Sequence, residues 1–169
     1  MLETLRKYIL AYKNKLTNAL FGVVHIKGQG KGNALVSYIT GPFTLAPGEY
    51  FTDPHSNYFV VEEMAKTFLE RGYDVDVIDW NNYSFIPKKK YNVMIDVDNN
   101  LGRLAPILGK DCIKIYFING SYWKHQNDSE ALRLSNLEKR RGVKMPSHRG
   151  VSVSKNSEVA DFIVGYGNK

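Results

Sequence analysis

The sequence predicts an α/β domain in which helices cover both faces of a parallel sheet, because two features alternate along the chain. Runs of strand length are rich in β-branched and aromatic residues, and segments with helical periodicity separate them. A helix between two strands brings the second strand back parallel to the first through a right-handed crossover. We therefore expect a Rossmann-like sheet with strands at 34–40, 75–80, 91–97, 113–118 and 160–164.

Three helices are predicted between these strands. The first begins at the Asp53-Pro54 pair, which suits an N-cap followed by a first-turn proline, and it continues to the end of the apolar spacing near residue 71. The second is short, around 101–108, and contains a proline. Asn127 and Glu130 have the spacing of a capping box, which predicts a third helix from 127 to about 141.

Composition indicates one globular domain with a buried core. The chain has 169 residues, of which 43% are hydrophobic and 24% charged. No apolar run approaches the roughly 20 residues that span a bilayer, and the N-terminal segment has the pattern of neither a membrane span nor a signal peptide. A lone cysteine, Cys112, has no partner for an internal disulfide, so the sequence predicts a reducing, cytoplasmic location.

The first 33 residues differ from the rest, so we predict a domain from 34 to 169 preceded by a separate segment. Residues 1–20 have the pattern of a basic amphipathic helix, and the glycine-rich residues 27–32 predict a flexible linker. The apolar face of this helix would dock onto the domain or a partner chain. The alternative is peripheral attachment to the inner face of a membrane through residues 1–20.

Candidate binding residues follow the predicted strands, because the carboxyl ends of parallel strands meet at one edge of a sheet. Gly41 follows the first strand, and a glycine there permits close approach of the backbone to a ligand. Asp98 follows the third strand, and Asn119, Ser121 and Tyr122 follow the fourth. Such polar and aromatic groups suit a polyhydroxylated ligand.

Two histidines and an asparagine at the same edge are further candidates. His55 and Asn57 lie at the start of the first long helix, where an imidazole could act as a general base or bind a sugar hydroxyl. His125 lies after the fourth strand. An equally favoured interpretation is that His55 is an ordinary surface histidine.

The sequence favours no metal and no other cofactor. Asp96 and Asp98 could hold a divalent cation as a pair, but so short a motif arises by chance, and it recurs at Asp74 and Asp76. The four histidines lack the spacing of a zinc site. No GxGxxG follows the first strand, and the glycine-rich residues 28–32 lack the ending of a P-loop, which argues against nicotinamide and nucleoside triphosphate binding.

The order of these pieces resembles a known family. A helix that ends in Phe68-Leu-Glu-Arg-Gly-Tyr-Asp-Val-Asp-Val-Ile-Asp79, after a strand and a glycine loop, looks like the opening of GT-B glycosyltransferases of the group 1, or family 4, kind. The resemblance covers about 34–167. It implies one half of a GT-B architecture, namely the N-terminal domain that binds the sugar acceptor, without the C-terminal domain that binds the nucleotide-sugar donor.

The resemblance also implies roles for particular residues. Gly41 matches the glycine loop near the donor phosphates, residues 55–57 match the start of the first long helix, and residues 119–125 match a loop that often carries a histidine meeting the donor sugar. His55 and His125 are then the catalytic candidates. The sequence departs from the family at 121–123, and His125 stands later than the family pattern expects.

The leading hypothesis is therefore a retaining glycosyltransferase half that transfers a sugar to a glycan or lipid-linked acceptor and is inactive without the donor domain. The alternative is a stand-alone Rossmann-like module that binds a nucleotide or sugar without turnover. The formal net charge of +6 attracts acidic partners, but the basic residues are spread along the chain, so no nucleic-acid partner is expected.

Overall fold

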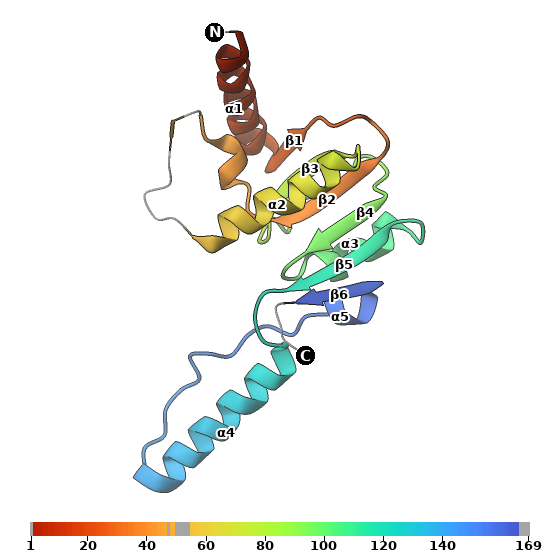
Figure 1. The fold of residues 1–169 in the computed structure, drawn as a ribbon. Helices are drawn as coiled ribbons and strands as arrows, with labels where there is room; N and C mark the ends of the chain where they lie inside the picture. The colour runs from red at the N-terminus through yellow and green to blue at the C-terminus, as the bar shows by residue number, and fades with distance from the viewer. Residues whose placement is uncertain (1, 47, 50–54, 166–169) are drawn as a thin grey trace.

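The computed structural model describes residues 2–46, 48–49 and 55–165, and it shows a Rossmann-like α/β fold (Figure 1). Within these ranges six strands form one sheet in the order β1-β3-β2-β4-β5-β6. The strands are β1 (Val23–Ile26), β2 (Asn33–Tyr38), β3 (Asp74–Asp79), β4 (Val93–Asp96), β5 (Ile113–Ile118) and β6 (Phe162–Gly165). The helices are α1 (Leu2–Phe21), the 3₁₀ helix η1 (Gly41–Thr44), α2 (Ser56–Glu70), α3 (Asn100–Leu108), α4 (Trp123–Arg141) and α5 (Asn156–Val159).

The predicted parallel sheet is confirmed. Strands β2 to β6 all run parallel to one another, and β5 has the predicted bounds, while the others differ by one or two residues at their ends. The interiors of β2 and β3 are buried on both faces, as expected for inner strands of a parallel sheet, and β3 holds Asp76 among its buried apolar residues. The two predicted features, strand-like runs and helical connections, therefore specify this part of the fold.

An additional strand, β1, lies at one edge of the sheet. It pairs antiparallel with β3, so that His25 stands directly opposite Asp76. The sequence does not predict this strand, which has only four residues and lies along the chain between the end of α1 and a glycine-rich segment.

Residues 27–32 are held against the sheet, so the prediction of a flexible linker is wrong. The backbone N–H of Gly28 donates to Asp74 Oδ1 over 2.8 Å, and Lys27 Nζ donates to Asp74 Oδ2 over 2.8 Å. Gln29 and Lys31 donate their backbone N–H groups to the carbonyl of Gly72. The glycines serve close packing here rather than freedom of motion.

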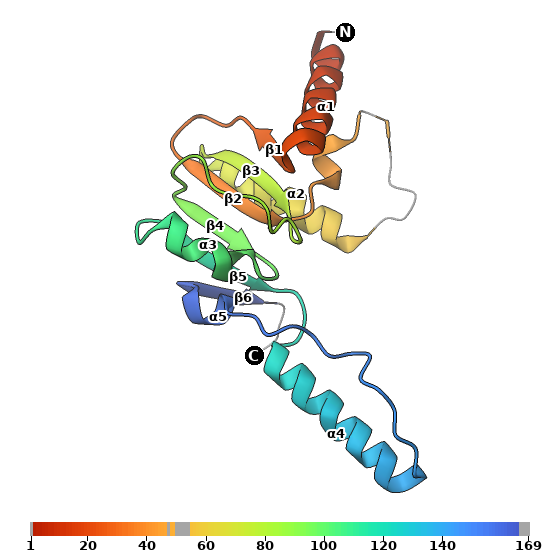
Figure 2. The same cartoon turned by 180° about the vertical axis from the view of Figure 1, so that it is seen from behind.

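Helices cover both faces of the sheet, as Figures 1 and 2 show from opposite sides. On one face α2 buries Val61 and Ala65 against alternate residues of β2 and β3, among them Val36 and Val77. On the other face α3 buries leucines against a second cluster that includes Leu35. Successive side chains of a strand point to opposite faces, so β1 to β5 each contribute to both clusters.

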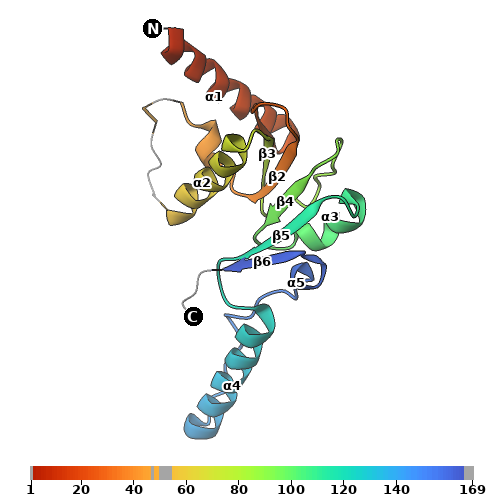
Figure 3. The same ribbon diagram turned by 45° about the vertical axis from the view of Figure 1, so that its right-hand side comes forward.

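Helix α4 projects away from the sheet instead of packing on it, which Figure 3 shows clearly. Its one buried residue is Glu130, and Arg133 pairs with that carboxylate over 2.8 Å. The predicted start at Asn127 is wrong, because the helix begins at Trp123. Asn127 is occupied elsewhere: its side chain exchanges two hydrogen bonds of 2.9 Å with the backbone of Val151, on the segment that returns from α4 to α5.

The predicted N-terminal helix is present as α1, but its expected docking face is not the face that packs. Leu5, Ile9 and Leu16 are 50 to 60% exposed. The contact with the domain runs through Ala11, which is buried, and Asn14, whose side chain donates to the carbonyl of Phe43 over 2.9 Å. Among the described residues no helix is long and apolar enough to cross a membrane.

Candidate functional site

A cleft of about 420 Å³ lies at the carboxyl edge of the parallel strands. The chain goes from β2 to β3 on one side of β2 and then crosses to β4 on its other side, so the connections change direction at this edge. Loops diverge at such a point and leave a crevice for ligands. The described lining comprises Trp80, Tyr83, Val97, Asp98, Asn99, Tyr116, Ile118, Asn119, Gly120, Ser121, Trp123, Gln126, Gly150, Val151, Ser152 and Ser154.

Three of the predicted site residues meet in this cleft. Asp98 lines it from the loop after β4, and Asn119 and Ser121 line it from the loop after β5. Asp98 Oδ2 accepts a hydrogen bond of 3.0 Å from the Tyr83 hydroxyl, and the backbone carbonyl of Asp98 accepts one of 3.1 Å from Ser154. The segment before α5 is thereby tied to the loop after β4.

The other five predicted site residues are not among the residues that line the cleft. Gly41 begins η1, and His55 caps α2 by accepting the backbone N–H of Asn57 at Nδ1 over 3.2 Å. The predicted cap at Asp53-Pro54 lies outside the described residues. Tyr122 precedes α4 and its ring lies 5.5 Å from that of Trp123.

His125 does not lie in a loop as predicted. It is the third residue of α4, where it is exposed, and its neighbour Gln126 lines the cleft in its place. Neighbouring residues of a helix point about 100° apart, so a helix that starts at Trp123 turns Gln126 toward the cleft and His125 away from it.

A buried polar network supports the floor of this edge. Asp96 is fully buried, and its Oδ2 accepts 2.7 Å hydrogen bonds from the backbone N–H of Leu101 and from the amide of Asn156. Burial raises the pKa of this carboxyl, and the hydrogen bonds that it accepts act in the opposite direction. The Asn156 Oδ1 accepts the backbone N–H of Gly102 over 2.9 Å.

This network has a consequence for ligand binding. The first turn of a helix usually offers unpaired N–H groups to a phosphate, but Asp96 and Asn156 already occupy those of Leu101 and Gly102 in α3. Asp96 and Asp98 also serve different purposes, because the first is enclosed in the network and the second lines the cleft. The pair therefore does not present two carboxylates to one cation.

Several residues that line the cleft are not predicted as site residues from the sequence. Tyr83 lies in the long connection between β3 and β4. Gln126 was not predicted because the helix was expected to begin at Asn127. The others are Gly150, Val151, Ser152 and Ser154, on the segment that returns from α4. The sequence of that segment has no helical or strand periodicity from which its position could be predicted. The one available signal was composition, since serine and glycine recur in it.

Comparison of the chain with protein-family models, with curated proteins and with solved structures gives no significant match in any of the three.

Proposed function

We propose that the carboxyl-edge cleft binds the sugar acceptor of a retaining glycosyltransferase, and that this cytoplasmic chain is the acceptor-binding half of a GT-B enzyme. A separate C-terminal domain would bind the nucleotide-sugar donor and complete the active site. The sugar would pass from that donor to a glycan or lipid-linked acceptor held in the cleft.

The observation that carries this proposal is the chemistry of the lining. Aromatic rings, among them Trp80 and Trp123, stand beside amide, hydroxyl and carboxylate groups such as Asn119, Ser121 and Asp98. A sugar ring has an apolar C–H face that packs on an aromatic plane, and hydroxyl groups that both donate and accept hydrogen bonds. The cleft offers both kinds of contact side by side.

The same lining favours an uncharged sugar over a nucleotide. No lysine, arginine or histidine occurs among the described residues of the cleft, and Asp98 contributes negative charge. A diphosphate is held by cationic groups or by free helix N–H groups. Those at the start of α3 are occupied, whereas α4 begins at Trp123 in the lining without a side-chain cap. The absence of cationic side chains among the described lining residues argues against nucleotide binding by the alternative, a stand-alone module that binds a nucleotide or sugar without turnover.

The proposal predicts that the chain binds a monosaccharide but not uridine diphosphate. Saturation-transfer NMR with glucose, galactose, mannose and N-acetylglucosamine should show transfer to at least one of them, and none to uridine diphosphate. Trp80→Ala should weaken that sugar by about tenfold, because it removes an aromatic plane from the cleft.

The matched control is Phe59→Ala, which removes another exposed ring, on α2 and away from the cleft. It should leave sugar binding unchanged. Saturation of uridine diphosphate without any sugar would count against an acceptor site and for the nucleotide-binding module. Equal losses in Trp80→Ala and Phe59→Ala would place sugar binding elsewhere.

We further propose that α1 contacts an anionic membrane surface at its periphery. The helix carries Arg6, Lys7, Lys13 and Lys15 against a single acidic residue, and its large apolar side chains from Leu5 to Phe21 are exposed, with Ile9 at 60%. The chain should co-sediment with phosphatidylglycerol vesicles at low salt, and Ile9→Asp should reduce the bound fraction. Equal sedimentation of Ile9→Asp and wild type would rule out insertion of this face.

A further inference from the structure

A second and larger cavity, of about 590 Å³, lies on the sheet face that α3 covers, and it shares no lining residue with the carboxyl-edge cleft. Helix α3 packs on β4 and β5 (Figure 2), whereas the cavity is lined by Val23 and His25 of β1 and by Asp76 of β3. The connection between β3 and β4, residues 84–91, and the end of α1 at Phe21 complete its walls.

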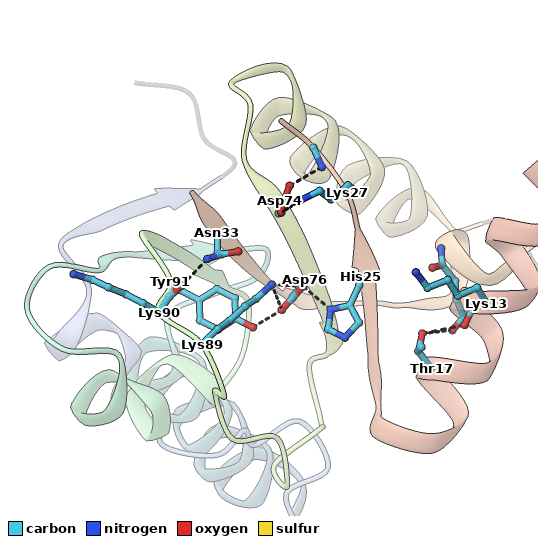
Figure 4. Close-up of polar contacts among 12 residues, drawn as sticks. Lys13, Thr17, His25, Lys27, Asn33, Asp74, Asp76, Lys89, Lys90 and Tyr91 are labelled. Carbon is cyan, nitrogen blue, oxygen red and sulfur yellow. Dashed lines mark hydrogen bonds and ion pairs between the residues drawn. The ribbon is translucent and has the colours of Figure 1, made fainter. Parts of the chain in front are cut away.

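One wall of the cavity is built around a buried carboxylate. Asp76 sits in the middle of β3 with its side chain only 3% exposed, and Figure 4 shows three side chains converging on it. His25 Nδ1 lies 2.7 Å from Asp76 Oδ1, and Lys89 Nζ lies 3.0 Å from Oδ2. The hydroxyl of Tyr91 donates to Oδ2.

These partners satisfy and neutralise Asp76. A carboxylate only accepts hydrogen bonds, so the proton of the imidazole resides on Nδ1 of His25. Burial raises the pKa of the Tyr91 hydroxyl, and the negative charge of Asp76 raises it further, so Tyr91 stays protonated as a donor. The positive charge of Lys89 balances the carboxylate.

The rim of the cavity keeps one cationic group in excess. Lys88 is exposed, and its side chain has neither an ion pair nor a hydrogen bond among the described residues. Beside it the walls are apolar: Phe21 is 62% exposed and Ile86 is 61% exposed, while Val23 and Phe85 lie deeper. If this cluster served only to hold β1 in place, it would need the ion pairs with Asp76 but not the open apolar cavity beside them.

We propose that this cavity is a second binding site, for an amphiphilic anion that has an apolar body and one carboxylate, sulfonate or phosphate group. The apolar body packs between Phe21, Ile86 and Phe85, and the anionic group is held by Lys88 at the rim. The volume is within the range of small-molecule sites, and apolar walls with few polar groups are their usual composition.

The test uses a matched pair of fluorescent probes. Anilinonaphthalene sulfonate is an amphiphilic anion, and phenylnaphthylamine has the same aromatic skeleton without the sulfonate. The wild-type chain should bind the sulfonate more tightly than the neutral probe. Lys88→Gln should weaken the sulfonate by about threefold and leave the neutral probe unchanged, as expected for one partly exposed ion pair. Lys110→Gln, at an exposed lysine that does not line the cavity, is the control.

A second variant tests the apolar wall. Ile86→Asp should weaken both probes, whereas Leu132→Asp, at a leucine of similar exposure on α4, should weaken neither. Thermal unfolding checks that each variant is folded, and Lys88→Gln alters only an exposed side chain. Equal binding of both probes by the wild type would overturn the anionic part of the proposal. Equal losses in Ile86→Asp and Leu132→Asp would overturn the site.

Discussion

Asp96→Ala is expected to lower the free energy of unfolding by about 3 kcal/mol, because it leaves buried donors without an acceptor. The backbone N–H of Leu101 and the amide of Asn156 both donate to this carboxylate over 2.7 Å. Urea unfolding followed by circular dichroism measures the loss. A loss within experimental error of zero would show that the network beneath the cleft does not hold the loop after β4 in place.

Asp96→Asn separates the hydrogen bonds from the charge. An amide oxygen at this position can accept from both Leu101 and Asn156, so most of the stability should remain. An asparagine that is as damaging as alanine would contradict this explanation.

The stability difference between Asp96→Asn and the wild type is also expected to depend on pH. Burial raises the pKa of Asp96 above its ordinary value of 3.8, so the folded chain holds this proton more tightly than the unfolded chain does. The corresponding stability is present at low pH and is lost as the pH rises through the pKa of the folded state. The stability of Asp96→Asn relative to the wild type should therefore increase with pH. A difference that is constant from acid to neutral pH would contradict the raised pKa.

Gly28→Ala is expected to destabilise the chain by about 3 kcal/mol, since there is no room for the added carbon. A Cβ at this position would lie 2.0 Å from the carbonyl oxygen of Tyr73 and 2.7 Å from its carbon. These are backbone atoms, so the connection from β1 to β2 must shift and give up the hydrogen bond from Gly28 to Asp74. Thermal and urea unfolding measure the effect.

Gly30→Ala is the matched control two residues away. A Cβ there meets nothing within 4 Å, but the φ of +74° strains any side chain, so we expect a loss of about 1 kcal/mol. If both variants lose the same small amount, residues 27–32 behave as the flexible linker that their composition indicates.

The sequence predicts the parallel part of the fold because strand and helix periods depend on local residue order. The sequence does not predict those parts of the fold that depend on contacts between residues far apart in the chain. Residues 27–32 have the composition of a linker, but Asp74 and Gly72, which hold them, are more than 40 residues away. The antiparallel strand β1 is too short to show a pattern of its own.

The candidate site was likewise predicted in part, and the remainder depends on tertiary contacts. Asp98, Asn119 and Ser121 come together because the topology of a parallel sheet brings strand ends to one edge. His125 was misplaced because Asn127 has the sequence of a helix cap, while its side chain actually ties down Val151. The cluster around Asp76 depends on a cross-strand pairing with His25 that no local pattern indicates.

The most direct test of the proposed acceptor site is a titration of the nitrogen-15 labelled chain with the monosaccharide that shows the strongest saturation transfer. Binding in the carboxyl-edge cleft predicts that the backbone amide signals of Asp98, Asn119, Gly120 and Ser121 shift together with one dissociation constant. The signal of Phe59 on α2 should stay in place. Unmoved cleft signals, or shifts confined to His25 and Ile86 in the second cavity, would contradict an acceptor site in the carboxyl-edge cleft.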